Sequence, residues 1–195
     1  MLKKWYRIVP VVVIAILIAM QPVLAKVKVQ VDFDPKFDFK PIRTWGWNPK
    51  GPGQLKMARS QNDNEEAMQK RVEPLILESV ATEMARRGLQ EAPGGPDLFV
   101  TYWVLLSTST TAQTLGQFLP GTTAWALPPF EQVTQSLKLA NSGALVIDMS
   151  DKSGVIWRGV ARADIDFDVS EQKRQALVRD AVRELLSKFP PKGKK

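Results

Sequence analysis

The 195-residue sequence contains no cysteine and no histidine. Without cysteine the chain forms no disulfide bond, so a hydrophobic core has to hold the fold together. The missing histidine removes the most common general base and the most common transition-metal ligand. Zinc sites of the Cys/His type and Ser-His or Cys-His nucleophile pairs are therefore excluded. We expect no catalytic residue, no metal and no cofactor, and we predict that the chain is not an enzyme.

Acidic residues are also in short supply, with 20 against 27 basic residues and a net charge of +7. Residues 1–25 hold three basic residues and no acid, so the rest of the chain carries 24 − 20 = +4. Three further lysines lie in a basic tail at 192–195, fewer than the roughly four to eight of a lipid-binding cluster. Because the excess lies at the two ends, the sequence does not indicate a nucleic-acid partner.

The first 25 residues have the three parts of a secretory signal. Lys3, Lys4 and Arg7 precede an apolar run at 8–20, and Ala25 offers a cleavage site. The run of thirteen residues is shorter than the about 20 that a spanning helix needs, which favours a signal peptide over an uncleaved anchor. We therefore expect export to the periplasm or envelope of a bacterium. A diacylglycerol anchor would need a cysteine at the cleavage point, which is absent.

Residues 26–191 are predicted to form a single α+β domain with two layers. Period-two alternation or β-forming composition predicts strands at 26–33, 43–47, 97–106, 132–139, 144–150 and 155–166, with a hairpin loop at 151–154. Apolar residues at three- and four-residue steps predict helices at 64–87, capped by Asp63 or Asn64, and at 170–189, capped by Ser170. Pro74 is expected to kink the first helix. The expected sheet is mostly antiparallel, with both long helices packed on one face.

Several segments, in this order, resemble the bacterial DUF4136 family of unknown function. They are residues 31–39 running into Thr44-Trp45-Gly46-Trp47, then 97–100, then 143–151 with 156–159, and finally Phe189-Pro190-Pro191. The resemblance spans residues 27–191 and implies an envelope protein. Many family members are lipoproteins, and this chain departs from them because it has no lipid-acceptor cysteine. The resemblance brings no catalytic or binding residues to carry over.

Two groups of carboxylates in the sequence are candidate sites. Asp164, Asp166 and Asp168 suggest a calcium loop, but the glycine and glutamate that an EF-hand requires are replaced by Val169 and Gln175. On a strand the three aspartates simply share the solvent face.

Asp32, Asp34 and Asp38 could supply the carboxylate pair of a cell-wall hydrolase. Asp34 precedes a proline and fits a turn, while Asp32 lies on the polar face of a strand, so the structural interpretation is preferred. The hydrolase remains an alternative function.

Asp148 and Arg158 lie on opposite arms of the predicted hairpin, where they can form a solvent-exposed cross-strand ion pair. Trp45, Trp103 and Trp157 are expected in the core beneath the helices.

The segment 107–130 contains no charged residue, and it has large apolar side chains between prolines. Its candidate partner-binding residues are Phe118, Leu119, Trp125, Leu127 and Phe130. The sequence therefore favours a non-catalytic binding or assembly module whose partner is an envelope protein or a cell-wall polymer. A protein tethered by an uncleaved N-terminal helix is the other alternative.

Overall fold

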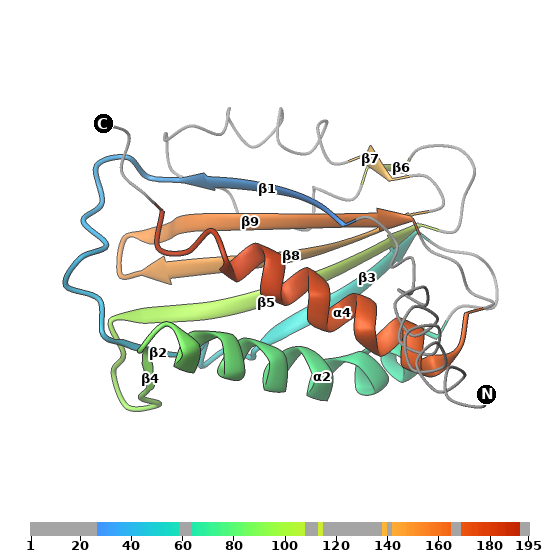
Figure 1. The fold of residues 1–195 in the computed structure, drawn as a ribbon, viewed down its shortest axis with the longest axis horizontal. Helices are drawn as coiled ribbons and strands as arrows, with labels where there is room; N and C mark the ends of the chain where they lie inside the picture. The colour runs from blue at the N-terminus through green and yellow to red at the C-terminus, as the bar shows by residue number, and fades with distance from the viewer. Residues whose placement is uncertain are drawn as a thin grey trace, which may run out of the picture.

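The chain forms two layers, a seven-stranded sheet and two helices that lie side by side on one of its faces (Figure 1). The computed structural model describes residues 27–58, 64–107, 113–114, 138–139, 142–164 and 169–191. The signal segment 1–25, the tail 192–195 and most of the strand expected at 132–139 lie outside these residues. The helices are α2 (Glu65–Arg86) and α4 (Glu171–Leu186). The strands are β1 (Lys28–Phe33), β2 (Thr44–Trp47), β3 (Gly53–Ala58), β4 (Gln90–Glu91), β5 (Leu98–Ser107), β8 (Ser142–Asp151) and β9 (Gly154–Asp164), with β6 (Gln113–Thr114) and β7 (Lys138–Leu139) paired separately.

The sheet is mixed, so the prediction of a mostly antiparallel sheet is wrong at one edge. Strands β1, β9, β8 and β5 are antiparallel neighbours in that order. Strands β2 and β3 both run parallel to β5, and β2 also runs parallel to β4. The cause is α2, which lies between β3 and β5 in the chain. A helical crossover returns the chain to the end where the previous strand began, so the next strand points the same way.

Strand β3 was not predicted, because its sequence has none of the β-branched or aromatic residues that mark strands. The helix beside it satisfies part of its backbone. The Leu55 amide donates to Gln69 Oε1 (3.2 Å), and the Met57 amide donates to Glu65 Oε1 (3.0 Å). Glu65 and Gln69 are four residues apart on α2 and therefore face the same way. Strand β3 is thus held by a strand on one side and by helix side chains on the other.

The same row of α2 continues to Glu73, which binds the hydroxyl of Tyr102 on β5. The Tyr102 hydroxyl and Gln69 Nε2 (3.2 Å) both donate to Glu73 Oε2. Burial raises the pKa of the Tyr102 phenol far above its usual range, and the hydrogen bond and negative charge of Glu73 raise it further. Tyr102 is therefore held in its neutral form against the sheet.

The helix caps agree with the sequence, and Asn64 is the residue that caps α2. Its Oδ1 accepts from the Ala67 amide (2.9 Å), and Ser170 Oγ accepts from the Lys173 amide (3.4 Å) at the start of α4. Helix α2 continues through Pro74, whereas α4 ends three residues before the predicted Phe189. Among the described residues, neither helix combines the length and the apolar character needed to cross a membrane.

Asp97 joins the starts of β2 and β5. One oxygen of its carboxylate, Oδ2, accepts from the Arg43 amide (2.9 Å), the Thr44 amide (2.8 Å) and the Thr44 hydroxyl (2.9 Å). These hydrogen bonds lower the pKa of Asp97, the bond from Arg43 most of all. The carboxylate therefore fixes the parallel register in which Trp45 faces Leu98.

The main core lies between the sheet and the helices and contains Trp45 and Trp157, both almost fully buried as expected. Trp103 differs. It packs against a separate, smaller cluster of Leu105, Ala144 and Val146. Because side chains alternate along β5 and β8, this cluster belongs to the sheet face turned away from the helices.

Asp148 and Arg158 form the predicted cross-strand pair, but the pair is buried, which corrects the expectation of an exposed one. The hairpin turns at Asp151–Gly154 as predicted and places Asp148 opposite Arg158. Arg158 Nε and Nη2 donate to the two carboxylate oxygens of Asp148 at 2.6 and 2.7 Å. Their exposed fractions are only 2% and 3%. The sequence shows the register but not the burial, because polar residues on a strand usually indicate its solvent face.

Substituting Asp148 by alanine should lower the free energy of unfolding by about 3–5 kcal/mol, because it removes the carboxylate that the buried Arg158 guanidinium binds through two hydrogen bonds. The double substitution Asp148→Leu with Arg158→Met should cost less than Asp148→Ala alone, since it removes both charges. Urea unfolding measures the difference. The control is Asp180→Ala, which removes the partly exposed ion pair with Arg183 and should cost about 0–1 kcal/mol. Equal losses for Asp148→Ala and Asp180→Ala would contradict the buried pair.

In the folded chain the Tyr102 phenol should titrate well above its usual pKa of 10.0. Unfolding should return its pKa to about that usual value. A pKa raised in the folded state stabilises the fold below about pH 10, and this contribution is lost as the pH rises further. Tyr102 is the only tyrosine after residue 25, so tyrosinate absorbance of the processed chain reports it directly. Glu73→Gln should bring the midpoint part of the way down, because burial, the larger cause, remains. A midpoint near 10 in the folded wild-type chain would contradict this.

Candidate functional site

A cavity of about 460 Å³ lies between the sheet and the helices, at the end where both helices begin. It is formed by the N-terminal parts of α2 and of α4 as far as Ala181, Leu55 of β3, the last residues of β5 and β9, the first residues of β8, and Val27. In Figure 1 this is the end at which β5 and β9 finish and the two helices start. Its volume falls within the range of about 300–1,000 Å³ that small-molecule sites occupy.

The wall of the cavity is mostly apolar. The lining side chains from the helices are Met68, Val72, Leu75, Ile76, Leu177, Val178 and Ala181, and those from the sheet include Leu55, Val104, Leu106, Leu145 and Ala161. Leu55, Ile76, Leu145 and Ala161 are buried and form the inner part. A ligand in this space would make van der Waals contacts with both layers.

Burial of the helices changes along their length. In α2 the later residues Ile76, Val80 and Met84 are fully buried, whereas Met68 and Val72 in the first half are only partly covered. Helix α4 shows the same change, because Val182, Leu185 and Leu186 are fully buried while Leu177 and Val178 are half-buried. The core between helices and sheet is therefore fully buried near the C-terminal ends of the helices and only partly covered near their N-terminal ends.

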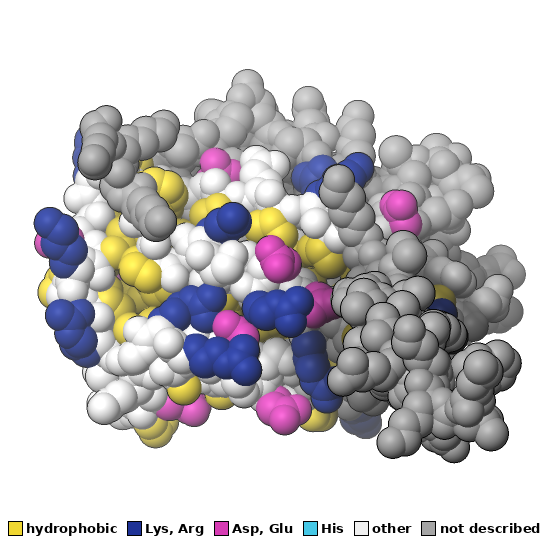
Figure 2. All heavy atoms as spheres, viewed as in Figure 1, with side chains coloured by type: hydrophobic (Ala, Val, Ile, Leu, Met, Phe, Trp, Pro, Cys, Tyr) yellow, Lys and Arg dark blue, Asp and Glu magenta, His cyan; other side chains and the backbone are white. Residues whose placement is uncertain are grey.

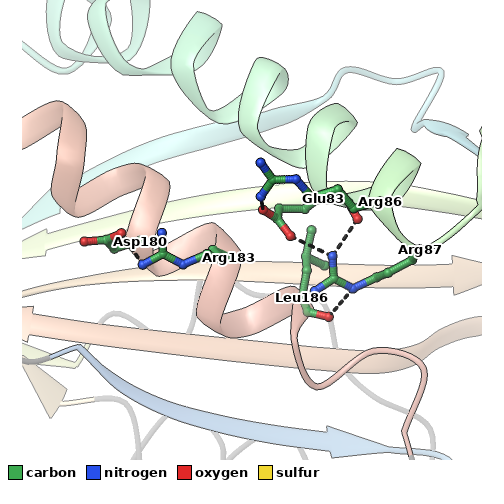
Figure 3. A network of polar contacts seen from close by, with 6 residues as sticks. All are labelled: Glu83, Arg86, Arg87, Asp180, Arg183 and Leu186. Atoms are coloured by element: carbon green, nitrogen blue, oxygen red, sulfur yellow. Dashed lines mark hydrogen bonds and ion pairs between the residues drawn. The ribbon is translucent and has the colours of Figure 1, made fainter.

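Arg87 joins the two helices at the closed end (Figure 3). Its Nε donates to the carbonyl of Leu186 at the end of α4 (2.6 Å). Its Nη1 pairs with the buried Glu83 carboxylate (2.7 Å) on α2, which Arg86 also binds (2.6 Å). The C-terminal ends of the helices are thus held together by the Arg87–Leu186 hydrogen bond.

Six charged residues, termed the rim, also line the cavity. Four are basic (Arg71, Arg162, Lys173, Arg174) and two are acidic (Asp164, Glu171), a balance of 4 − 2 = +2. Glu171 accepts from Arg174 at 3.0 and 3.2 Å and from Gln175 at 3.3 Å; these hydrogen bonds, that of Arg174 first, lower its pKa. Burial lowers the pKa of Arg162. Figure 2 shows Lys and Arg side chains gathered over the two helices on this face.

The carboxylates considered for a hydrolase, Asp32, Asp34 and Asp38, make local hydrogen bonds. Asp34 and Asp38 accept hydrogen bonds from the amides of Lys36 (2.8 Å) and Lys40 (3.0 Å), as turn residues do, and Asp32 accepts from its neighbour Gln30. Asp164 lies at the cavity rim, whereas Asp166 and Asp168 lie outside the described residues. Within the described ranges, no three His, Cys, Asp or Glu side chains lie where they could share a metal ion.

The predicted partner-binding residues Phe118, Leu119, Trp125, Leu127 and Phe130 also lie outside the described residues. The cavity was not predicted. The signal for it was present, because the apolar face of α2 begins at Met68, a full two turns before the first fully buried position at Ile76. Periodicity identifies such a face but does not show how completely a neighbouring element covers it.

Three solved structures match this chain at low identity, each with a TM-score below 0.5. A PDZ domain protein from Parabacteroides distasonis is 11% identical, with 87% of this chain covered and a TM-score of 0.46; the chain spans 38% of that protein. A DUF4136 family protein from Bacteroides thetaiotaomicron is 19% identical, with 84% and 96% of the two chains covered and a TM-score of 0.46. A PelC dodecamer from Paraburkholderia phytofirmans is 8% identical, with 83% and 96% covered and a TM-score of 0.40.

The comparison with curated proteins gave no match. The family model described as a domain of unknown function, DUF4136, matches residues 29–191, from the second residue of β1 to the proline pair beyond α4. This match covers well over half of the chain and agrees with the resemblance found in the sequence. The chain therefore belongs to the DUF4136 family.

Proposed function

We propose that this chain is a non-catalytic binding module of the bacterial cell envelope that holds an apolar ligand in the interlayer cavity. The observation that carries the proposal is the cavity itself, with mostly apolar walls, a buried inner part and a rim of six charged residues. Ligand sites commonly combine an apolar wall with a few polar groups that fix orientation.

The lining favours binding over catalysis. Its polar side chains are those of Arg71, Arg162, Asp164, Lys173 and the Glu171 cluster, and Glu171 is engaged by Arg174 and Gln175. A general base needs a proton-accepting group poised near neutral pH. The pKa of Glu171 is instead held below its usual range, which favours a structural carboxylate.

The envelope is proposed as the compartment because residues 1–25 have the charge and apolar pattern of an export signal. Val27, two residues after the proposed cleavage point, lines the cavity. Removal of the preceding apolar segment would leave the new N-terminus beside the cavity mouth.

Export predicts that the protein recovered from bacterial cells is found in the envelope or periplasmic fraction and begins at Lys26. Mass spectrometry of the intact protein measures the N-terminus, and cell fractionation measures the compartment. Substituting Ala25 by a bulky residue should block processing and leave the chain membrane-associated, since signal cleavage needs a small residue there. Wild-type protein that retains Met1 and stays in the cytoplasm would refute export.

The cavity should bind a neutral apolar dye such as Nile red. Val178→Trp should weaken binding by about tenfold, equivalent to ~1.4 kcal/mol, because the indole occupies space that the dye needs. The matched control is Gln172→Trp, at an exposed position of α4 outside the lining, which should leave the affinity unchanged. Dye fluorescence measures the dissociation constants on protein recovered from the envelope fraction. Failure of the wild type to bind, or equal effects of the two substitutions, would contradict the cavity as the ligand site.

A further inference from the structure

We infer that the ligand is an anionic amphiphile with one hydrocarbon chain, of the fatty-acid class, whose tail lies between the two layers and whose head group meets the basic rim. The inference rests on the proposed function, since it requires a cavity that binds. It goes further by assigning the ends of the ligand to different parts of the site.

The inner part fits a hydrocarbon tail. The side chains that close it, including Ile76 (0% exposed) and Leu145 (8%), are aliphatic. Each methylene that such a wall removes from water contributes about 0.8 kcal/mol. A tail would also cover the half-buried Val72 and Val178, whose apolar surface is otherwise exposed to water at the mouth.

The rim fits an anionic head. The lining carries two more basic than acidic groups, and Glu171 is already engaged by Arg174. Arg71 and Lys173 are exposed, one on each helix, and no acid among the described residues lies within ion-pair distance of either, although Arg71 is near enough to Glu171 to help lower its pKa. A carboxylate at the mouth would therefore meet one lining cation from each helix, Arg71 from α2 and Lys173 from α4.

Nearby acids do not cancel this charge. Glu66 pairs with Lys70 (2.6 Å), and Glu65 accepts from the Met57 amide (3.0 Å) and lies 4.0 Å from Lys56. Asp164 at the end of β9 is exposed, and it is included in the balance of +2. A neutral amphiphile would gain the tail contacts alone, so the rim distinguishes ligands by head-group charge.

The test compares dodecanoate with dodecanol, which share a chain length and differ in head-group charge. Both displace Nile red from the protein recovered from the envelope fraction, each kept below its aggregation concentration. Dodecanoate should bind at least about tenfold more tightly than dodecanol at low salt, and added salt should reduce this preference because it screens the rim. Arg71→Gln with Lys173→Gln should weaken dodecanoate binding to the level of dodecanol and leave dodecanol unaffected. The control Arg179→Gln removes an exposed cation of α4 outside the lining and should change neither.

The outcomes separate this inference from the proposed function. Equal binding of dodecanoate and dodecanol, with the dye still bound, would overturn the anionic ligand and leave the binding cavity in place. Loss of dye binding as well would overturn both. Co-sedimentation with anionic phospholipid vesicles that free dodecanoate does not compete away would assign the rim to a membrane surface and overturn the inference. A dimer abolished by Val178→Trp, or a cavity filled by residues 8–25 in protein that retains Met1, would overturn it in the same way.

Discussion

The hydrogen bond between Arg87 and the Leu186 carbonyl fixes how the two helices meet at their C-terminal ends. It joins the C-terminal ends of α2 and α4 above the sheet, where Glu83 holds the guanidinium in place. From this fixed end the helices cover the sheet fully as far back as Ile76 and Ala181. Toward their N-termini the cover is incomplete, and the cavity begins there. The fully buried core therefore lies at the closed end of the interface between helices and sheet, where Arg87 makes its contact. The open end of this interface is the candidate site.

A second polar constraint lies on the opposite face of the sheet. The Asp148–Arg158 pair is almost fully buried in the middle of the β8–β9 ladder, with two hydrogen bonds in a fork arrangement. Buried pairs of this kind cost desolvation energy, and hydrophobic replacements can be equally stable. Their geometry nevertheless fits only one register, because a slip of one residue moves each partner to the other face. The pair is thus better explained as a device for register than as a source of stability.

The sequence predicted those parts of the fold that depend on local patterns. The caps at Asn64 and Ser170, the hairpin at Asp151–Gly154 and the cross-strand pair all follow from neighbouring residues, and the structure has them. It missed what depends on distant partners. Strand β3 exists because β5 and the Gln69 side chain bind its backbone, and the parallel edge exists because α2 crosses over before β5. The cavity was missed for the same reason, since the exposure of Val72 and Val178 reflects the distance between two elements and not their composition.

Exposed aliphatic surface at the mouth of a cavity has a physical consequence for the free protein. Val72, Leu75, Leu177 and Val178 are placed on the faces that the two helices turn inward, yet they are only half-buried. The free energy of the protein in water falls when an apolar group covers surface of this kind. A small movement of the helix N-termini toward each other would also cover it, but Glu65 and Gln69 hold the first turns of α2 to the edge of β3. Since α2 is tied to the sheet at this end and to α4 at the other, the fold itself keeps the cavity open, and this open end is where we propose that a ligand binds.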